Sequence, residues 1–230
     1  MNNLIQNYEL ILKTLQENCS NITSFKQIRT PKLSNLELAA LDLTAEYMML
    51  NSELQLFRTI KNTCLEDKIE RSNYNKRRRK LFHYIENIRQ SISAKFRHLS
   101  NVFIVDSAPI EICEPCRAKR SNICATDRGY ISADYQLDLF NESQIRLTVP
   151  TRKNQHNQVE FSSTKRRKRK RIETLISQLD GQFSMNKNFA KTFEGLASRI
   201  LSKITALTII QYLNLFVFNR NINSLKINLC

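Results

Sequence analysis

Hydrophobic side chains recur at helical spacing through the first hundred residues. Apolar residues three and four positions apart fall on one face of an α-helix, so each such stripe predicts a helix packed against a core. The two clearest stripes are Leu4, Tyr8, Ile11 and Leu15, and then Leu81, Phe82, Ile85, Ile88 and Ile92. Residues 1–100 are therefore predicted to be helical.

Residues 33–38 carry the pattern of a helix start. Ser34 and Glu37 have the spacing of a capping box, in which each side chain accepts a hydrogen bond from the backbone N–H of the other residue. Leu33 and Leu38 have the spacing of a hydrophobic staple, which fixes the direction from which the chain enters the helix. A helix is predicted from here to about Leu50.

The second half of the chain contains two segments with the pattern of β-strands. Residues 102–106 form an apolar, mostly β-branched run that ends in an acid, which is typical of a strand buried on both faces of a parallel sheet. Residues 144–150 alternate apolar and polar positions, as a half-buried strand does. Helical stripes at 172–179 and from about Asn188 follow. We therefore predict an α/β chain, in which a helical N-terminal region precedes a small, mainly parallel sheet with helices.

The charge of the chain points to a polyanionic partner. Its 230 residues include 36 Lys and Arg against 21 Asp and Glu, a formal net charge of +15. Such an excess attracts nucleic acid or an anionic membrane. The most apolar stretch, residues 204–218, is short for a membrane span and contains Gln211 and Asn214. We therefore expect nucleic acid, and no membrane, as the partner.

A helix that is predicted to start near Ser72 has a basic N-terminal part. In helix-turn-helix proteins the first residues of the recognition helix enter the major groove, where Arg and Asn read base edges. A helix with a solvated basic end fits the same residues equally well, and both interpretations stay open. The candidate DNA-contacting residues are Asn73, Asn75, Lys76, Arg77, Arg78 and Arg79.

Seven consecutive basic residues lead directly into the helical stripe at 172–179. Such a run is usually a solvated arm, but this one continues into a helix with a buried face. Glu173 lies at the border of the apolar stripe, which favours a site that holds a metal ion against a polyanion. The run consists of Lys165, Arg166, Arg167, Lys168, Arg169, Lys170 and Arg171.

Six cysteines in a chain without a predicted signal segment favour a reducing, cytoplasmic setting. Cys113, Cys116 and Cys124, with His156 as a fourth ligand, have some of the features of a zinc site. A structural zinc site usually draws its four ligands from two close pairs, and the second pair is missing here. Reduced thiols are the favoured interpretation of these cysteines.

Three acidic motifs follow one another in the second half of the chain: Ile104-Val105-Asp106-Ser107, Asp127-Arg128-Gly129-Tyr130-Ile131-Ser132 and Arg171-Ile172-Glu173. They resemble the three acidic signatures of DDE transposases, the enzymes of bacterial insertion sequences, and the resemblance covers nearly the whole chain. It implies a helix-turn-helix-like DNA-binding region at 1–100, a ribonuclease H-like catalytic domain at 101–220 and a C-terminal tail at 221–230.

The resemblance also implies the chemistry. Asp106, Asp127 and Glu173 would be the catalytic residues and would hold two Mg²⁺ ions, for which Mn²⁺ could substitute, about 4 Å apart for in-line displacement at phosphorus. Arg152, Lys153 and the basic run would hold the DNA backbone. The expected activity is cleavage and strand transfer at the terminal inverted repeats of an insertion sequence and into target DNA, by a homo-oligomer in the cytoplasm, associated with the nucleoid.

The spacing of the first two acids departs from the family pattern. Only 20 residues, Ser107 to Thr126, separate them, whereas the fold requires a strand hairpin and a further strand at this place. We therefore expect an internally deleted copy, shortened between 107 and 126, with reduced or lost activity. The alternatives are a catalytically dead DNA-binding remnant and, on charge alone, an RNA-binding structural protein.

Overall fold

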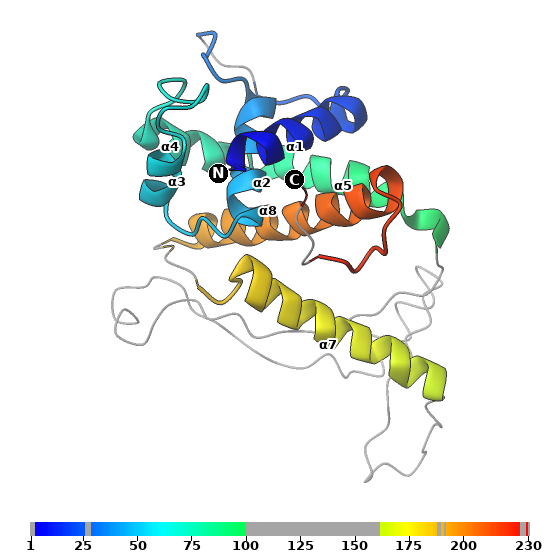
Figure 1. The fold of residues 1–230 in the computed structure, drawn as a ribbon. Helices are drawn as coiled ribbons and strands as arrows, with labels where there is room; N and C mark the ends of the chain where they lie inside the picture. Colours follow the sequence, from blue (N-terminus) through cyan, green and yellow to red (C-terminus); the bar gives the residue numbers. More distant parts are fainter. Residues whose placement is uncertain are drawn as a thin grey trace, which may run out of the picture.

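A computed structural model describes residues 3–25, 29–99, 162–187, 190, 192–225 and 229 of the chain. Figure 1 shows that the described elements are helices, several of which pack side by side in one body. In chain order they are α1 (Leu4–Cys19), α2 (Asn35–Tyr47), α3 (Glu53–Thr59), α4 (Arg71–Lys80), α5 (Phe82–Ala94), the 3-10 helix η1 (Arg97–Leu99), α7 (Ser163–Phe183), α8 (Phe193–Tyr212) and the π-helical turn η3 (Leu213–Val217).

The start of α2 confirms the predicted capping box. The backbone N–H of Glu37 donates to Ser34 Oγ at 3.2 Å, and the backbone N–H of Ser34 donates to Glu37 Oε2 at 2.7 Å. These two bonds satisfy N–H groups that have no partner inside the helix. Leu33 and Leu38 are both fully buried, as a hydrophobic staple requires. The helix ends at Tyr47, shortly before the predicted end, where Met49 takes a positive φ of 55°.

Helix α8 lies at the centre of the described structure and packs against α2 on one side and α5 on another, while α1 covers α2 and α5 (Figure 1). We call α1, α2, α4, α5 and α8 the helical body. The predicted stripes face its interior: Leu4, Ile11 and Leu15 of α1 and Ile88 and Ile92 of α5 are buried. Each side chain of this kind contributes about 1.5–3 kcal/mol when it leaves water, so these contacts stabilise the body.

Helix α7 contacts the hydrophobic core through its C-terminal half. Leu175 and Leu179 are partly buried against the core, and Phe183 is fully buried at the end of the helix. In Figure 1 the helix slants away below the helical body toward its N-terminal end. The predicted helix at 172–179 is confirmed, and it begins earlier than its apolar stripe because the basic residues before it are helical as well.

The prediction of an α/β chain with a ribonuclease H-like sheet is wrong for the part of the chain that the structure describes, where the regular elements are helices and no strand occurs. The physical reason lies in α8. It lies in the region 101–220 that was predicted to form the sheet domain, but it packs on α2 and α5 of the N-terminal region. The predicted strands at 102–106 and 144–150 lie outside the described residues, and the domain boundary at residue 100 stays a prediction.

Helix α8 and η3 together are long and apolar enough to cross a membrane. The segment Phe193–Val217 reaches a mean hydropathy of 1.5 in its most apolar window, and half of that window is buried inside the protein. Core helices of soluble proteins have the same composition, and α8 carries the buried polar residues Ser202 and Lys203. Packing against α2 and α5 is sufficient to explain why this helix is apolar.

Candidate nucleic-acid interface

Helix α4 has one buried face and one exposed, basic face. Tyr74 and Leu81 are each 1% exposed and anchor the helix on the helical body. On the opposite face Asn73, Lys76 and Arg79 are exposed. The helix follows Glu70, whose extended backbone directs the chain into the first turn. The structure thus presents three of the six predicted DNA-contacting residues of α4 to solvent.

The other three predicted residues of α4 make contacts within the protein. Arg77 donates through Nη2 to the backbone oxygen of Leu33 at 2.8 Å and to Asn35 Oδ1 at 2.9 Å. Asn75 donates through its side-chain amide to a carboxylate oxygen of Glu53 on α3. These contacts position α4 on its neighbours, and the helical period explains why residues of one basic cluster divide between two faces.

Arg78 is the third of these residues, and its side chain is only 11% exposed. Its Nε lies 2.6 Å from Asp42 Oδ1, and its Nη2 donates to Glu46 Oε1 at 2.6 Å. Tyr74 donates through its hydroxyl to the same Asp42 oxygen at 2.9 Å. Arg78 therefore joins α4 to α2, and its guanidinium binds the two buried carboxylates of α2 instead of facing solvent.

Helix α8 completes this buried charge network. Lys203 Nζ lies 2.6 Å from Glu46 Oε2 and donates to the backbone oxygen of Phe183, at the end of α7. Ser202 donates through its hydroxyl to Asp42 Oδ2 at 2.6 Å. The two carboxylates of α2 are thus bound from both sides, by α4 and by α8. Within the described residues this network ties the first third of the chain to its C-terminal region.

The network changes the acidity of its members. Burial raises the pKa of the Glu46 carboxyl, but Arg78, Lys203 and Arg199 outweigh burial and hold the pKa below its usual value. Burial also lowers the pKa of Lys203. Because Glu46 stays ionised, it can neutralise the cations that surround it. A buried charge without a partner costs several kcal/mol, so the network stays stable only while all its members are present.

Sequence reasoning missed this network, although the sequence contains a signal for it. Asp42 and Glu46 lie four residues apart in the otherwise apolar helix α2. Tyr74 and Arg78 have the same spacing in α4, and so have Arg199 and Lys203 in α8. Residues at this spacing lie on one face of a helix. Three such pairs of charged or hydroxyl-bearing side chains indicate a shared polar core.

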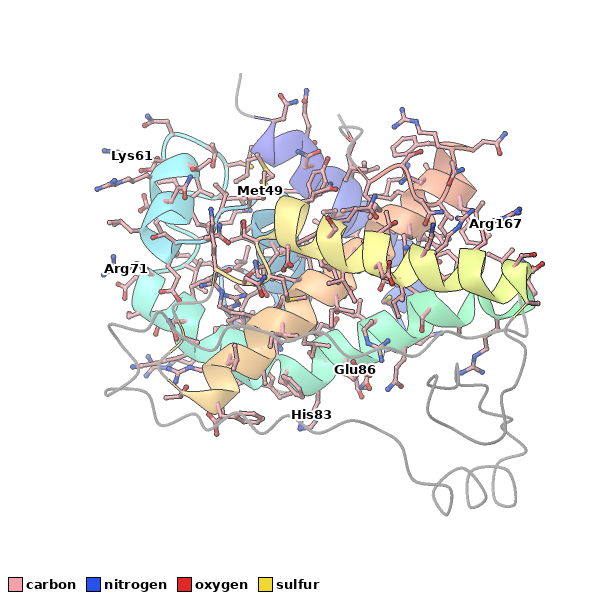
Figure 2. The ribbon with its side chains drawn as sticks, turned by 90° about the horizontal axis from the view of Figure 1, so that it is seen from below. Met49, Lys61, Arg71, His83, Glu86 and Arg167 are labelled. Carbon is pink, nitrogen blue, oxygen red and sulfur yellow. The ribbon has the colours of Figure 1, made fainter. Side chains whose placement is uncertain are left out.

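The basic run forms the first part of α7. Arg167, Lys170 and Arg171 have exposed side chains, and Glu173 is exposed two residues later. Lys165, Arg166, Lys168 and Arg169 occupy backbone positions of the same helix. Figure 2 places Arg71, at the start of α4, and Arg167, on α7, at opposite ends of the described structure. The two basic helices therefore offer two separate surfaces to a polyanion.

The connection between α3 and α4 differs from a helix-turn-helix. Such motifs join their two helices by a turn of 3–4 residues, whereas residues 60–70 separate α3 from α4. The loop contains turns with positive φ at Asn62 and Asp67, and its Leu65 is buried. The two helices still contact each other. The unit is a helix–loop–helix in which α4 shows its basic face.

The predicted metal site stays a prediction. Asp106, Asp127, Arg152 and Lys153 lie outside the described residues, as do Cys113, Cys116 and Cys124. Across the described ranges, no group of three or more His, Cys, Asp or Glu side chains is placed to hold a metal ion. Glu173 alone of the three predicted catalytic acids is described, on the exposed face of α7. The thiols of buried Cys19 and exposed Cys64 are both free.

The comparisons with known proteins assign no family to the chain. No protein-family model, no curated protein and no solved structure matches it. The function must therefore be argued from the surfaces of α4 and α7 and from the acidic motifs of the sequence.

Proposed function

We propose that the chain is a DNA-binding protein of the DDE transposase type, which binds duplex DNA at the terminal inverted repeats of an insertion sequence. The observation that carries the proposal is the presence of exposed basic residues on two helices from opposite parts of the chain. Asn73, Lys76 and Arg79 are exposed on α4, and Arg167, Lys170 and Arg171 on α7. The net charge of +15 supports the same partner.

The two surfaces have different chemistry. Asn and Arg side chains on an exposed helix face can make bidentate bonds to adenine and guanine edges, which is how sequence is read in the major groove. The candidate contacts on α7 are Lys and Arg side chains, which contact phosphates and fix position without specifying bases. We therefore assign recognition of the terminal repeat to α4 and contact with the DNA backbone to α7.

The test is a gel shift with duplex DNA that carries the terminal repeat, compared with scrambled DNA. We expect the double variant Lys76→Gln, Arg79→Gln to lose affinity for the repeat by roughly 30-fold or more, because each of the two charge-assisted bonds contributes about 1–3 kcal/mol and every 1.4 kcal/mol is about a factor of ten. The double variant Lys13→Gln, Lys95→Gln removes the same charge from exposed positions on α1 and after α5. Equal losses in the two variants would contradict recognition by α4.

DNA cleavage and strand transfer with Mg²⁺ or Mn²⁺ is the second candidate function. Glu173, within one turn of the exposed Lys170 and Arg171 on α7, favours it, together with the motifs around Asp106 and Asp127. We propose these three acids as metal ligands and, for the active form, a homo-oligomer at the nucleoid. Strand transfer that disappears in Glu173→Ala supports the enzyme, whereas DNA binding without any strand transfer supports the remnant.

A further inference from the structure

A cavity of about 760 Å³ with polar and apolar walls opens between α2, α3, α4 and the start of α8. It lies beside the buried charge network and apart from the basic face of α7. Asp42, Glu46, Arg78 and Arg199 form part of its wall, and the apolar side chains Leu50, Leu54 and Leu56 form another part. The volume lies in the range of small-molecule sites, which is about 300–1,000 Å³. The cavity therefore has room for a ligand the size of a nucleotide.

The charge of the cavity favours an anion. The described residues that line it include four arginines, Arg71, Arg78, Arg79 and Arg199, against three carboxylates, Asp42, Glu46 and Glu53. Behind the wall Lys203 contributes a further positive charge 2.6 Å from Glu46. The described groups thus carry two more positive than negative charges.

Arg199 has unused hydrogen-bonding capacity at this site. Its Nη2 donates to the backbone oxygen of Asn51 at 2.8 Å, while its Nε lies 3.7 Å from Glu46 Oε1, too far for a hydrogen bond. This Nε is buried and has no hydrogen-bond partner among the described residues. A guanidinium presents a planar fork that matches the oxygens of a phosphate group. A small turn of the Arg199 side chain, which lines the cavity, would bring its guanidinium to an anion there.

The start of α8 adds a second attraction. Thr192 caps the helix through Oγ1, which accepts from the backbone N–H of Gly195 at 3.2 Å, and both residues line the cavity. The first N–H groups of a helix carry a partial positive charge and bind phosphate groups. A Cβ on residue 195 would lie only 3.2 Å from Thr192 Oγ1, which is a tight contact. Glycine at this position therefore lets the first turn of α8 lie close to the hydroxyl that caps it.

We propose that this cavity binds a phosphate group that carries an organic part, as a nucleotide does. The phosphate lies between Arg71 and Arg199 near the start of α8, and the sugar or base lies against Leu54 and Leu56. The nucleotide is either free or part of a DNA strand held by α4. The site uses arginines other than those assigned to the DNA-reading face, except for Arg79 at the border of both.

Isothermal titration calorimetry with deoxyadenosine monophosphate, and with deoxyadenosine as the phosphate-free control, tests the proposal. We expect the monophosphate to bind and the nucleoside to bind at least tenfold more weakly. Arg71→Gln should weaken monophosphate binding about tenfold, since it removes one charge-assisted bond. Lys80→Gln, an exposed position at the other end of α4, should leave it unchanged. Arg199→Gln should have at least the effect of Arg71→Gln, provided that thermal unfolding shows a folded variant.

Equal affinities of wild type and Arg71→Gln, or no heat of binding at millimolar monophosphate, would overturn the proposal. Competition with fluorescent terminal-repeat DNA then identifies the source of the phosphate. Displacement of the DNA by the monophosphate assigns the cavity to a DNA nucleotide, and simultaneous binding assigns it to a free nucleotide. If the cavity binds no monophosphate, the gel-shift result for Lys76 and Arg79 is unaffected. The two proposals can therefore fail separately.

Discussion

At the scale of single residues, Glu46 has the most consequential environment in the described structure. It is 2% exposed and receives ion pairs from Arg78, Lys203 and Arg199, which come from two helices far apart in the sequence. A buried pair adds little net stability compared with an apolar substitute, but removing one partner leaves the others charged in a medium of low polarity. Replacing Glu46 by alanine should therefore change the free energy of unfolding much more than replacing a surface carboxylate does.

Replacement of Glu46 by alanine should reduce the free energy of unfolding by about 3–5 kcal/mol, because Lys203 and Arg78 lose a buried counter-charge. Urea unfolding followed by circular dichroism measures the change. Glu86→Ala is the matched control: Glu86 pairs with Arg89 on the surface of α5, where both side chains are about one-third exposed. Surface pairs contribute about 0–1 kcal/mol. Similar losses in both variants would contradict a special role for Glu46.

The acidity of Glu46 predicts a pH dependence of stability. Its carboxyl has a pKa below the usual value of about 4.5 in the folded protein, so the unfolded chain takes up the proton at higher pH than the folded chain does. This contribution to stability is complete above the usual pKa and is lost as the pH falls through the folded pKa. Urea unfolding between about pH 3 and 7 should show a steeper acid loss in wild type than in Glu46→Gln. Parallel curves would contradict the prediction.

At the scale of elements, the two N-caps of α2 and α3 show how local sequence determines a helix end. Ser34 and Glu37 have the capping pattern, and the structure contains both reciprocal bonds. Ser52 occupies the same position before α3, but within the described residues its side chain makes no cap bond. The capping-box pattern is thus not sufficient by itself, because Gln55 stands three positions after Ser52 as Glu37 stands after Ser34.

Ser34→Ala should lower the free energy of unfolding by about 1 kcal/mol, because the backbone N–H of Glu37 loses its acceptor. Ser52→Ala should change it by a few tenths of a kcal/mol, as a surface substitution does. Both variants are measured by thermal unfolding under the same conditions. A larger loss for Ser52 than for Ser34 would show that the caps were assigned to the wrong helices.

At the scale of the whole molecule, local patterns in the sequence predicted helices well and their arrangement poorly. The stripes of α1 and α5 and the start of α2 depend on neighbours within one or two turns, so the sequence determines them directly. The partner of the apolar face of α8 is a long-range choice. A hydrophobic face fits a sheet or another helix equally well, and the resemblance led us to expect the sheet.

The candidate site likewise contains features that local sequence predicts and features that depend on distant residues. Exposure of Asn73, Lys76 and Arg79 agrees with a basic helix face, which the composition of α4 already indicated. The inward direction of Arg78 depends on Asp42 and Glu46, which lie more than thirty residues earlier. The helical period could have separated the two faces of α4, but only the position of α2 shows which of them is buried.

Because α8 forms the centre of the helical body, damage to it should destabilise the N-terminal helices as well. Ile209→Ala should cost about 2–5 kcal/mol, the usual range for a buried isoleucine or leucine, and should weaken amide protection in α2 and α5 along with α8. Native-state hydrogen exchange measures this. Phe193→Ala, at a position 70% exposed at the start of the same helix, should leave protection in α2 and α5 unchanged. Loss of protection confined to α8 would contradict a shared core.

The hydrogen bond between Ser202 and Asp42 joins residues 160 positions apart in the chain. A ribosome that adds about 5–20 residues per second needs roughly 10–30 s to proceed from one to the other. During that interval the newly made α2 exposes its two carboxylates and the surrounding leucines to solvent, because the helix that later covers them has not been made. Arg78 arrives early and can neutralise one of the carboxylates. The nascent N-terminal region is therefore the stage of synthesis at which we expect chaperones to bind and aggregation to begin.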